Sequence, residues 1–192
     1  METFLVIPLL VLFAFGIGKV LATRTTVIKQ PKLGILDLSN GEYSSCIGGD
    51  KTVLQKVFPT LSESFDAPPV CDVLLIYGHV ESGGSIKNSK IGLREIIRDS
   101  QASVVVFATD NPANNYLQAG QRKPYGRANL VMTIDRKGDV FAQFFQRLFT
   151  AMKQGTPMPV AWVKLAPQIP NTAHNDCPDT IFACELGQIA FA

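Results

Sequence analysis

The sequence is poor in the residues that build metal sites. It has two histidines and four cysteines in 192 residues. No two cysteines form a C-x-x-C pair, and no cluster of cysteine and histidine has the spacing of zinc ligands. We therefore expect no bound metal and no other cofactor. The even number of cysteines permits two disulfides but does not require them.

Charge is also scarce. Charged residues make up 18% of the chain and the net charge is +2, which implies no strong electrostatic partner. The cations do not form a stripe with interleaved aromatic residues, so we expect no nucleic-acid binding. Heptads, internal repeats and low-complexity tracts are absent from the sequence. The length is sufficient for one domain with a substantial core.

A long apolar stretch opens the chain, from residue 4 to residue 22, interrupted only by Lys19. Its length is about that needed to cross the hydrocarbon core of a bilayer, ~20 residues. Two interpretations compete: a signal peptide cleaved before Thr23, or a retained single-pass anchor. The distribution of charge favours the anchor, because Glu2 precedes the stretch and cations follow it. The positive-inside rule then places the remaining chain in the cytoplasm, and the membrane becomes its first predicted partner.

The rest of the chain alternates between patterns typical of strands and of helices. We interpret residues 23–32 as a linker and residues 33–192 as a single α/β domain with a mostly parallel sheet flanked by helices. Strands are predicted at 33–38, 73–77, 102–108, 128–134, 180–184 and 188–191. Helices are predicted from an Asp50 N-cap to about Pro59, and at 91–99, 140–154 and 158–166. Residues 62–69 and 114–127 are predicted to be loops.

The strand at 73–77 carries the main functional signal. Its uninterrupted apolar residues predict burial on both faces, and it ends at Gly78 with His79 next. In open α/β sheets, ligands bind at the carboxyl edge. Asp110 follows the neighbouring predicted strand, so we expect it at the same edge as His79. The run Ser82-Gly83-Gly84 allows close backbone approach, and with Gly78 it is our candidate ligand-binding segment.

A second glycine-rich piece, Gly48-Gly49-Asp50-Lys51-Thr52, does not match the phosphate-binding P-loop. The P-loop pattern has Gly directly before Lys-Ser/Thr, whereas Asp50 stands between them here. A carboxylate at that position would oppose phosphate. We interpret this piece as a turn that leads into a helix.

The order of these parts resembles the CHAT branch of the caspase-like fold, a group that includes cysteine peptidases. The resemblance rests on the strand that ends in Gly78-His79, the strand 104–108 with Thr109-Asp110, the helix segment 144–149 with Gly155, and the terminal 181–189 region. It covers residues 70–191 and implies a caspase-like three-layer α/β/α domain. In that family a catalytic His ends one strand and the nucleophilic Cys ends the next.

This chain departs from the family pattern at the nucleophile. Asp110 stands where the family has its Cys, and a carboxylate is a poor substitute for a thiolate in acyl transfer. Val80, rather than Gly, follows His79. The resemblance thus implies a pseudo-peptidase that binds a protein or peptide at the sheet edge, with His79 and Asp110 as vestigial catalytic positions.

Two other functions stay open at this point. One is a hydrolase with His79 as base, Asp110 as its orienting partner, and Ser82, Ser85 or Thr109 as nucleophile. The chain has no Gly-x-Ser-x-Gly elbow to support it. The other is a small-molecule or nucleotide-binding domain that uses the Gly48-Gly49 and Gly83-Gly84 pieces.

Overall fold

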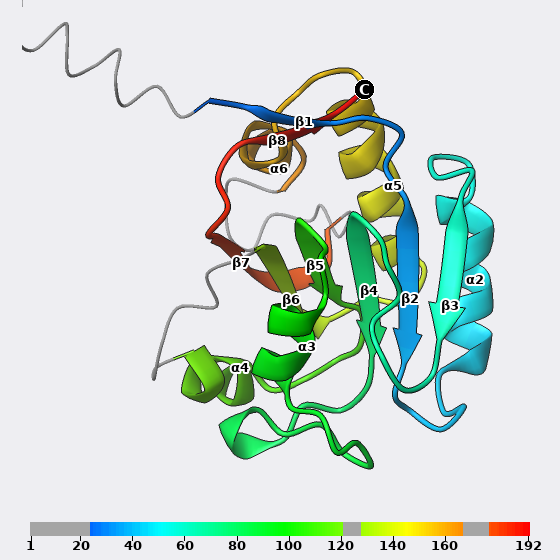
Figure 1. Cartoon of the computed structure of the whole chain (residues 1–192), viewed down its shortest axis with the longest axis vertical. Helices are drawn as coiled ribbons and strands as arrows, with labels where there is room; N and C mark the ends of the chain where they lie inside the picture. Colours follow the sequence, from blue (N-terminus) through cyan, green and yellow to red (C-terminus); the bar gives the residue numbers. More distant parts are fainter. Residues whose placement is uncertain (1–23, 121–127, 167–176) are drawn as a thin grey trace, which may run out of the picture.

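The computed structural model describes residues 24–120, 128–166 and 177–192 (Figure 1). Its centre is a six-stranded sheet with the order β3-β2-β4-β5-β6-β7. The strands are β2 (Leu33–Asp37), β3 (Leu61–Ser64), β4 (Val73–Tyr77), β5 (Val104–Phe107), β6 (Asn129–Asp135) and β7 (Asp179–Cys184). All neighbours pair in parallel except β6 and β7, which are antiparallel. The predicted α/β class with a mostly parallel sheet is confirmed.

Helices cover both faces of the sheet. One face packs against α2 (Ser44–Leu54), α5 (Val140–Lys153) and α6 (Met158–Leu165), and the other against α3 (Leu93–Asp99) and α4 (Ala113–Gly120). Side chains alternate along each strand, so β4 sends Leu75 and Tyr77 into the first layer and Leu74 and Ile76 into the second. Each face of the central strands is therefore buried, which accounts for their continuous apolar sequences.

The first helical layer has an aromatic core. α5 contributes six buried aromatic or large apolar residues to this core: Phe141, Phe144, Phe145, Leu148, Phe149 and Met152. Trp162 of α6 packs edge-on against Phe144, with ring centroids 5.1 Å apart. The helix predicted at residues 140–154 is confirmed, and its aromatic side chains belong to the core. Gly155 follows the helix with φ 83°, a conformation that glycine adopts without steric cost.

A small second sheet joins the two ends of the described chain. β1 (Thr26–Ile28) pairs in parallel with β8 (Ile189–Phe191). The turn before β8 is held at the amino end of β6, because Asn129 Oδ1 accepts a hydrogen bond from the Leu186 amide. The two-stranded sheet therefore lies at the amino ends of the parallel strands, opposite their carboxyl ends (Figure 1).

Several sequence-based boundaries are wrong. The helix predicted from an Asp50 N-cap begins earlier, at Ser44, so Gly48, Gly49 and Asp50 lie inside α2. The interpretation of Gly48-Gly49 as a turn is wrong for the same reason. These glycines also cannot form a nucleotide-binding loop, because they lie within the helix. Glycines disfavour helices by only about 1 kcal/mol each, and Ile47 and Leu54 of α2 are buried against the sheet. Tertiary burial here outweighs local propensity.

Three further elements were missed. The predicted loop 62–69 contains most of β3, a short edge strand that pairs with β2. The predicted loop 114–127 begins with most of α4, which buries Tyr116. The predicted linker 23–32 contains β1. All three elements are short, and β3 and α4 are rich in polar residues. Neighbouring strands or buried contacts hold them in place, so periodicity alone carried little signal for them.

In the described ranges, no helix combines the length and apolar character that crossing a membrane requires. The predicted anchor at residues 4–22 lies outside those ranges. All four cysteines are free thiols.

Candidate functional site

The strand order has a topological switch point between β2 and β4, and we refer to the carboxyl ends of these two strands as the crevice. The chain leaves β2 for a helix on one face of the sheet and leaves β4 for a helix on the other face. Such a reversal opens a crevice at the carboxyl ends of the two strands, and this is where α/β sheets bind ligands. The residues at this crevice are therefore the candidate site.

His79 stands at the β4 side of the crevice, as predicted. The backbone at Gly78, just before His79, lies close to neighbouring side chains. A Cβ on Gly78 would lie 3.2 Å from Ile86 Cγ2 and 3.4 Å from Leu38 Cβ. The His79 side chain is 34% exposed. It is thus accessible to a ligand and is not a fully buried core histidine.

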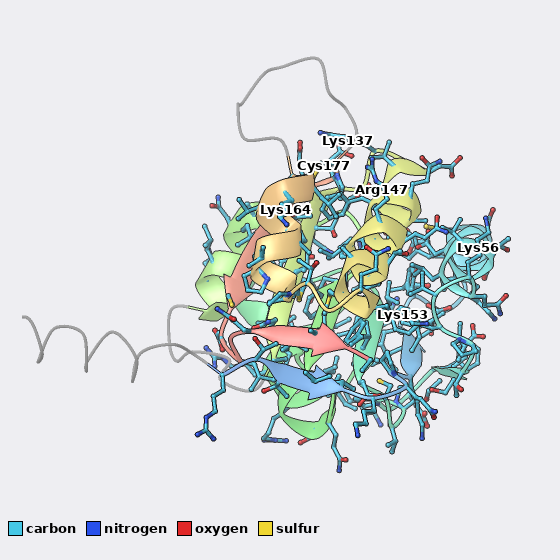
Figure 2. All side chains as sticks on the ribbon, turned by 90° about the horizontal axis from the view of Figure 1, so that it is seen from above. Lys56, Lys137, Arg147, Lys153, Lys164 and Cys177 are labelled. Atoms are coloured by element: carbon cyan, nitrogen blue, oxygen red, sulfur yellow. The ribbon has the colours of Figure 1, made fainter. Side chains whose placement is uncertain are left out.

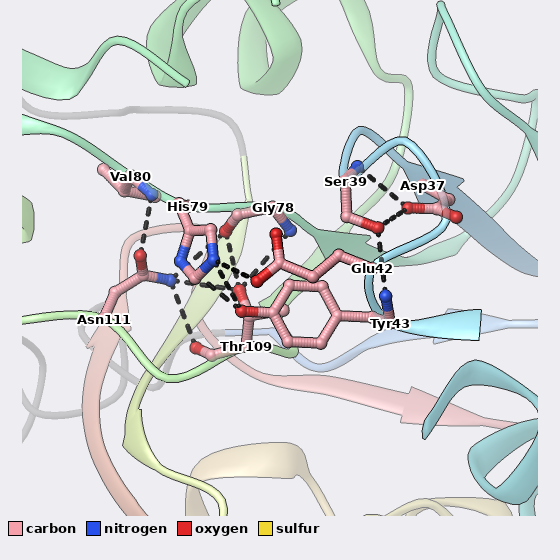
Figure 3. Close-up of polar contacts among 9 residues, drawn as sticks. All are labelled: Asp37, Ser39, Glu42, Tyr43, Gly78, His79, Val80, Thr109 and Asn111. Carbon is pink, nitrogen blue, oxygen red and sulfur yellow. Dashed lines mark hydrogen bonds and ion pairs between the residues drawn. The ribbon is translucent and has the colours of Figure 1, made fainter. Parts of the chain in front are cut away.

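The partners of His79 come from the turn that follows β2, on the other side of the crevice (Figure 3). Glu42 Oε1 lies 3.0 Å from His79 Nε2, and the Tyr43 hydroxyl lies 2.9 Å from the same nitrogen. The hydrogen bond to His79 lowers the pKa of Glu42. Burial, and then the negative charge of Glu42, raise the pKa of Tyr43. The group combines the Glu42 carboxylate, the His79 ring and a Tyr43 phenol whose raised pKa keeps it protonated at neutral pH.

The turn after β2 is itself held by local hydrogen bonds. Asp37, the last residue of β2, accepts hydrogen bonds from the Ser39 amide and the Ser39 hydroxyl through the same oxygen. The Ser39 oxygen accepts a further one from the Tyr43 amide at 3.3 Å. These bonds fix where Glu42 and Tyr43 leave the backbone, so the pair is positioned before any ligand arrives.

Thr109 and Asn111, which follow β5, hold the segment around His79 against the sheet through hydrogen bonds. The Thr109 hydroxyl donates to the Gly78 carbonyl at 2.7 Å, and Asn111 Oδ1 accepts from the Val80 amide at 2.7 Å. Asn111 Nδ2 also donates to the Tyr116 hydroxyl at 3.0 Å. Thr109 is completely buried, and its hydroxyl proton is engaged by a backbone carbonyl. This arrangement suits positioning and leaves Thr109 unsuited to act as a nucleophile.

Asp110 lies at the predicted edge, but its carboxylate is used elsewhere. Its Oδ1 accepts a 2.7 Å hydrogen bond from the Arg136 amide, at the end of β6. Among the contacts of the described residues, none joins Asp110 to His79. The carboxylate that contacts His79 is that of Glu42, which sequence reasoning missed.

The glycine-serine run forms a compact turn of its own. Ser82–Gly84 is a single 3-10 turn, η1, with positive φ at Gly83 and Gly84. Val80 and Ile86 form an antiparallel bridge across its base. The Ser85 hydroxyl donates to Glu81 at 3.1 Å. The positive φ angles explain the glycines without a ligand, and none of the contacts found for Ser82 and Ser85 in the described chain involves His79.

A cavity of about 650 Å³ adjoins the His79 group. Glu42 and Tyr43 belong to both, and the other walls come from α2 along its length, the turn after β6 and the first turn of α5. The lining includes Ser45, Cys46, Gly49, Asp50, Thr52, Val53, Arg136, Gly138, Asp139, Ala142 and Gln143. Its size is within the range of small-molecule and side-chain binding sites.

A buried ionic network lies in the wall of this cavity. Arg136 Nη2 lies 2.9 Å from both carboxylate oxygens of Asp50, and the Tyr77 hydroxyl donates to Asp50 at 2.6 Å. Arg136 also donates to the Ala108 carbonyl and lies 4.0 Å from the centre of the Phe141 ring. Burial raises the pKa of Asp50, which the Arg136 charge partly opposes, and raises the pKa of Tyr77 well above its usual value. The network joins β4, β6, α2 and α5 beneath the site.

Cys46, in the first turn of α2, is the thiol that lines the cavity. It is half-buried, and burial, followed by the negative charge of Asp50, raises its pKa. No hydrogen bond between Cys46 and His79 is among those of the described residues. A thiol with a raised pKa is poorly suited to nucleophilic attack, because the thiolate is the reactive form.

The sequence held one usable signal for the residues that were missed. Glu42 and Tyr43 follow Ser39-Asn40-Gly41, the turn that ends the first strand of the sheet. Once that strand is known to pair with β4, its following turn must meet His79 at the crevice. Arg136 and Cys46 carry no comparable local signal. The described residues contain no group of three or more His, Cys, Asp or Glu side chains able to hold a metal ion.

No protein-family model matches this chain, and no curated protein matches it.

Proposed function

We propose that this chain is a membrane-anchored, CHAT-like (caspase-like) domain that has lost peptidase chemistry and binds a protein or peptide at the carboxyl edge of its sheet. The anchor is the apolar stretch 4–22, and the globular domain lies on the cytoplasmic side. His79 and Asp110 are the remnants of the dyad positions. The binding surface is the crevice between β2 and β4 with the adjoining cavity.

The observation that carries this proposal is the set of partners around His79. Its Nε2 is engaged by Glu42 and Tyr43, and Asp110 is engaged by the Arg136 amide. Thr109, the hydroxyl nearest in sequence to the family's nucleophile position, is buried and donates to a backbone carbonyl. The residues that a working dyad would need are thus occupied in positioning contacts. The fastened crevice and the cavity supply a preorganised surface for a ligand.

A second candidate function, hydrolysis with His79 as base, is favoured by one contact. A carboxylate 3.0 Å from an imidazole can orient the ring and stabilise its charged form. In this version Glu42 takes the orienting role that the sequence had given to Asp110. The nucleophile would be a water molecule or the hydroxyl of Ser82 or Ser85.

Peptidase activity is tested with the full chain in detergent micelles. A panel of thiol-reactive peptide probes would be applied to the wild type, His79→Ala and Cys46→Ser. We expect no labelling that depends on His79. Labelling of Cys46 that disappears in His79→Ala would contradict the proposal, because it would demonstrate a working Cys/His pair. Hydrolysis of generic esters and peptides that falls in His79→Ala would instead support the second candidate.

Peptide binding is tested separately. The wild type, Tyr43→Ala and Leu117→Ala would be titrated with a fluorescent peptide library by anisotropy. Leu117 is an exposed apolar residue of α4 and serves as the matched control. A central interface residue typically contributes about 2 kcal/mol or more, which is about thirtyfold in affinity. Binding that Tyr43→Ala weakens about thirtyfold and Leu117→Ala leaves unchanged therefore supports the crevice as the site. Absence of binding by the wild type, or equal effects of both variants, argues against it.

A further inference from the structure

The end of the molecule opposite the candidate site carries its own surface. We define the anchor-side surface as the exposed side of β1, α6 and the turn before β8. β1 and β8 lie side by side at the amino ends of the sheet strands, and α6 lies next to β8 (Figures 1 and 2). The described chain begins here, at residue 24, two residues before β1.

Exposed apolar side chains gather on this surface. Seven large apolar residues are prominently exposed in the described chain, and four of them belong to the anchor-side surface. They are Val27 of β1, Val160 and Val163 of α6, and Leu186 of the turn before β8, between 41% and 59% exposed. The remaining three, Phe65, Val70 and Leu117, lie on other segments. Single exposed apolar residues are ordinary, but a concentration of them on one surface indicates contact with something less polar than water.

Cations accompany these apolar residues. Arg24 and Lys29 flank β1, and Lys164 is exposed next to Val163 on α6 (Figure 2). Glu185, beside Leu186, is the acid in the same turn. Apolar side chains with a majority of cations among their charged neighbours suit the interface of a bilayer that contains anionic lipids.

We propose that the anchor-side surface rests on the headgroup region of an anionic bilayer, so that the His79 crevice faces away from the membrane. This inference rests on the membrane anchor of the proposed function. The apolar stretch ends at residue 22 and β1 begins at Thr26, which is too short a separation to let this surface lie far from the bilayer. The carboxyl edge lies at the opposite end of the strands, so a partner approaches His79 from the aqueous side.

The test uses the full chain, reconstituted in vesicles, with one environment-sensitive fluorophore per molecule. In a Cys46→Ser, Cys184→Ser background, the label is placed at Val163→Cys, Val27→Cys or, as the carboxyl-edge control, Ser82→Cys. The two remaining thiols are buried, and their raised pKa values, about 12 for Cys71 and about 11 for Cys177, leave them protonated at the labelling pH. Vesicles contain phosphatidylcholine alone or with phosphatidylserine, and bromine-labelled lipids act as quenchers.

We expect labels at Val163 and Val27 to be quenched roughly twofold more than the label at Ser82, and more strongly in vesicles with phosphatidylserine. Equal quenching at all three positions overturns the inference. Labels at Val163 and Val27 that are shielded from aqueous iodide but not quenched by lipid also overturn it, because a protein or a second copy then covers the surface. Equal quenching in both lipid mixtures removes the role of the anionic headgroups.

Vesicle flotation separates this inference from the function on which it rests. A chain that does not float with the vesicles has no anchor, and both the proposed membrane attachment and the orientation then fail. A chain that floats while its Val163 label behaves as the Ser82 label does retains the anchor and loses only the orientation.

Discussion

Two polar clusters lie at the carboxyl edge of the sheet, and they differ mainly in burial. In the His79 cluster, Glu42 is about half exposed and the imidazole is one-third exposed. In the Asp50 cluster, the side chains of Asp50 and Arg136 are almost completely buried. Both contain a carboxylate, a cation or cationisable group, and a tyrosine hydroxyl. The same kinds of side chain therefore stabilise the fold in the Asp50 cluster, where water is excluded, and stay accessible to ligands in the His79 cluster, where it is not.

The difference predicts unequal costs of disruption. Arg136→Met leaves the Asp50 carboxylate buried without its charge partner, which we expect to destabilise the fold by about 3–5 kcal/mol. His79→Ala removes a partly exposed pair that solvent screens, so it should cost much less than Arg136→Met. Chemical denaturation of both variants measures the two values.

A double variant sharpens this prediction. Asp50→Asn with Arg136→Met removes both charges and keeps an acceptor for the Tyr77 hydroxyl, so it should be more stable than Arg136→Met alone. If the double variant loses the sum of the two single losses, the clusters do not differ in the way we infer.

Removal of the hydrogen bonds that Asn111 and Asn115 make to Val80 should have an intermediate effect on stability. Asn111→Leu leaves the buried Val80 amide without its acceptor, with an expected loss of about 1–3 kcal/mol. Asn115→Ala is the matched control, because it removes one bond to the Val80 carbonyl in a less buried place, and should cost about 1 kcal/mol. Amide hydrogen exchange at Val80 should accelerate only in Asn111→Leu; unchanged exchange would argue against the positioning role.

The smallest effect is expected from the exposed carboxylate. The hydrogen bond to His79 lowers the pKa of Glu42 in the folded state below its unfolded value. The resulting stability is therefore present above the unfolded pKa and is lost as the pH falls through the lower folded pKa. The Tm of the wild type should slightly exceed that of Glu42→Gln at pH 7, and the gap should close in acid. A gap that widens as the pH falls would contradict the assigned contact.

The carboxyl edge shows how far residue patterns reach. The continuous apolar run 73–77 predicted a central strand, and its end predicted His79 at the edge. The apolar run of the neighbouring strand likewise predicted that Asp110 lies at the same edge of the sheet. The predicted partner of Asp110, His79, was wrong. The Asp110 carboxylate accepts a hydrogen bond from the Arg136 amide at the end of β6, and no local sequence pattern encodes which neighbour a short side chain will face.

Glu42 and Tyr43 illustrate the same limit from the other side. They come 36 residues or more before His79 in the chain. Their meeting follows from the pairing of β2 with β4, which leaves β3 at the sheet edge. Sequence reasoning recognised the β2 strand but not β3, and so it could not infer which strand became the neighbour of β4.

Residue patterns were sufficient to predict the α/β class, the buried central strands, the helix of residues 140–153 and the position of His79 after a central strand. These follow from hydrophobic periodicity, which is a local property. The three-dimensional arrangement was needed to learn that Gly48 and Gly49 belong to a helix, that Glu42 and Tyr43 contact His79, and that Asp50 and Arg136 are buried together. Those outcomes depend on strand order and on long-range burial, which outweigh propensities of about 1 kcal/mol per residue.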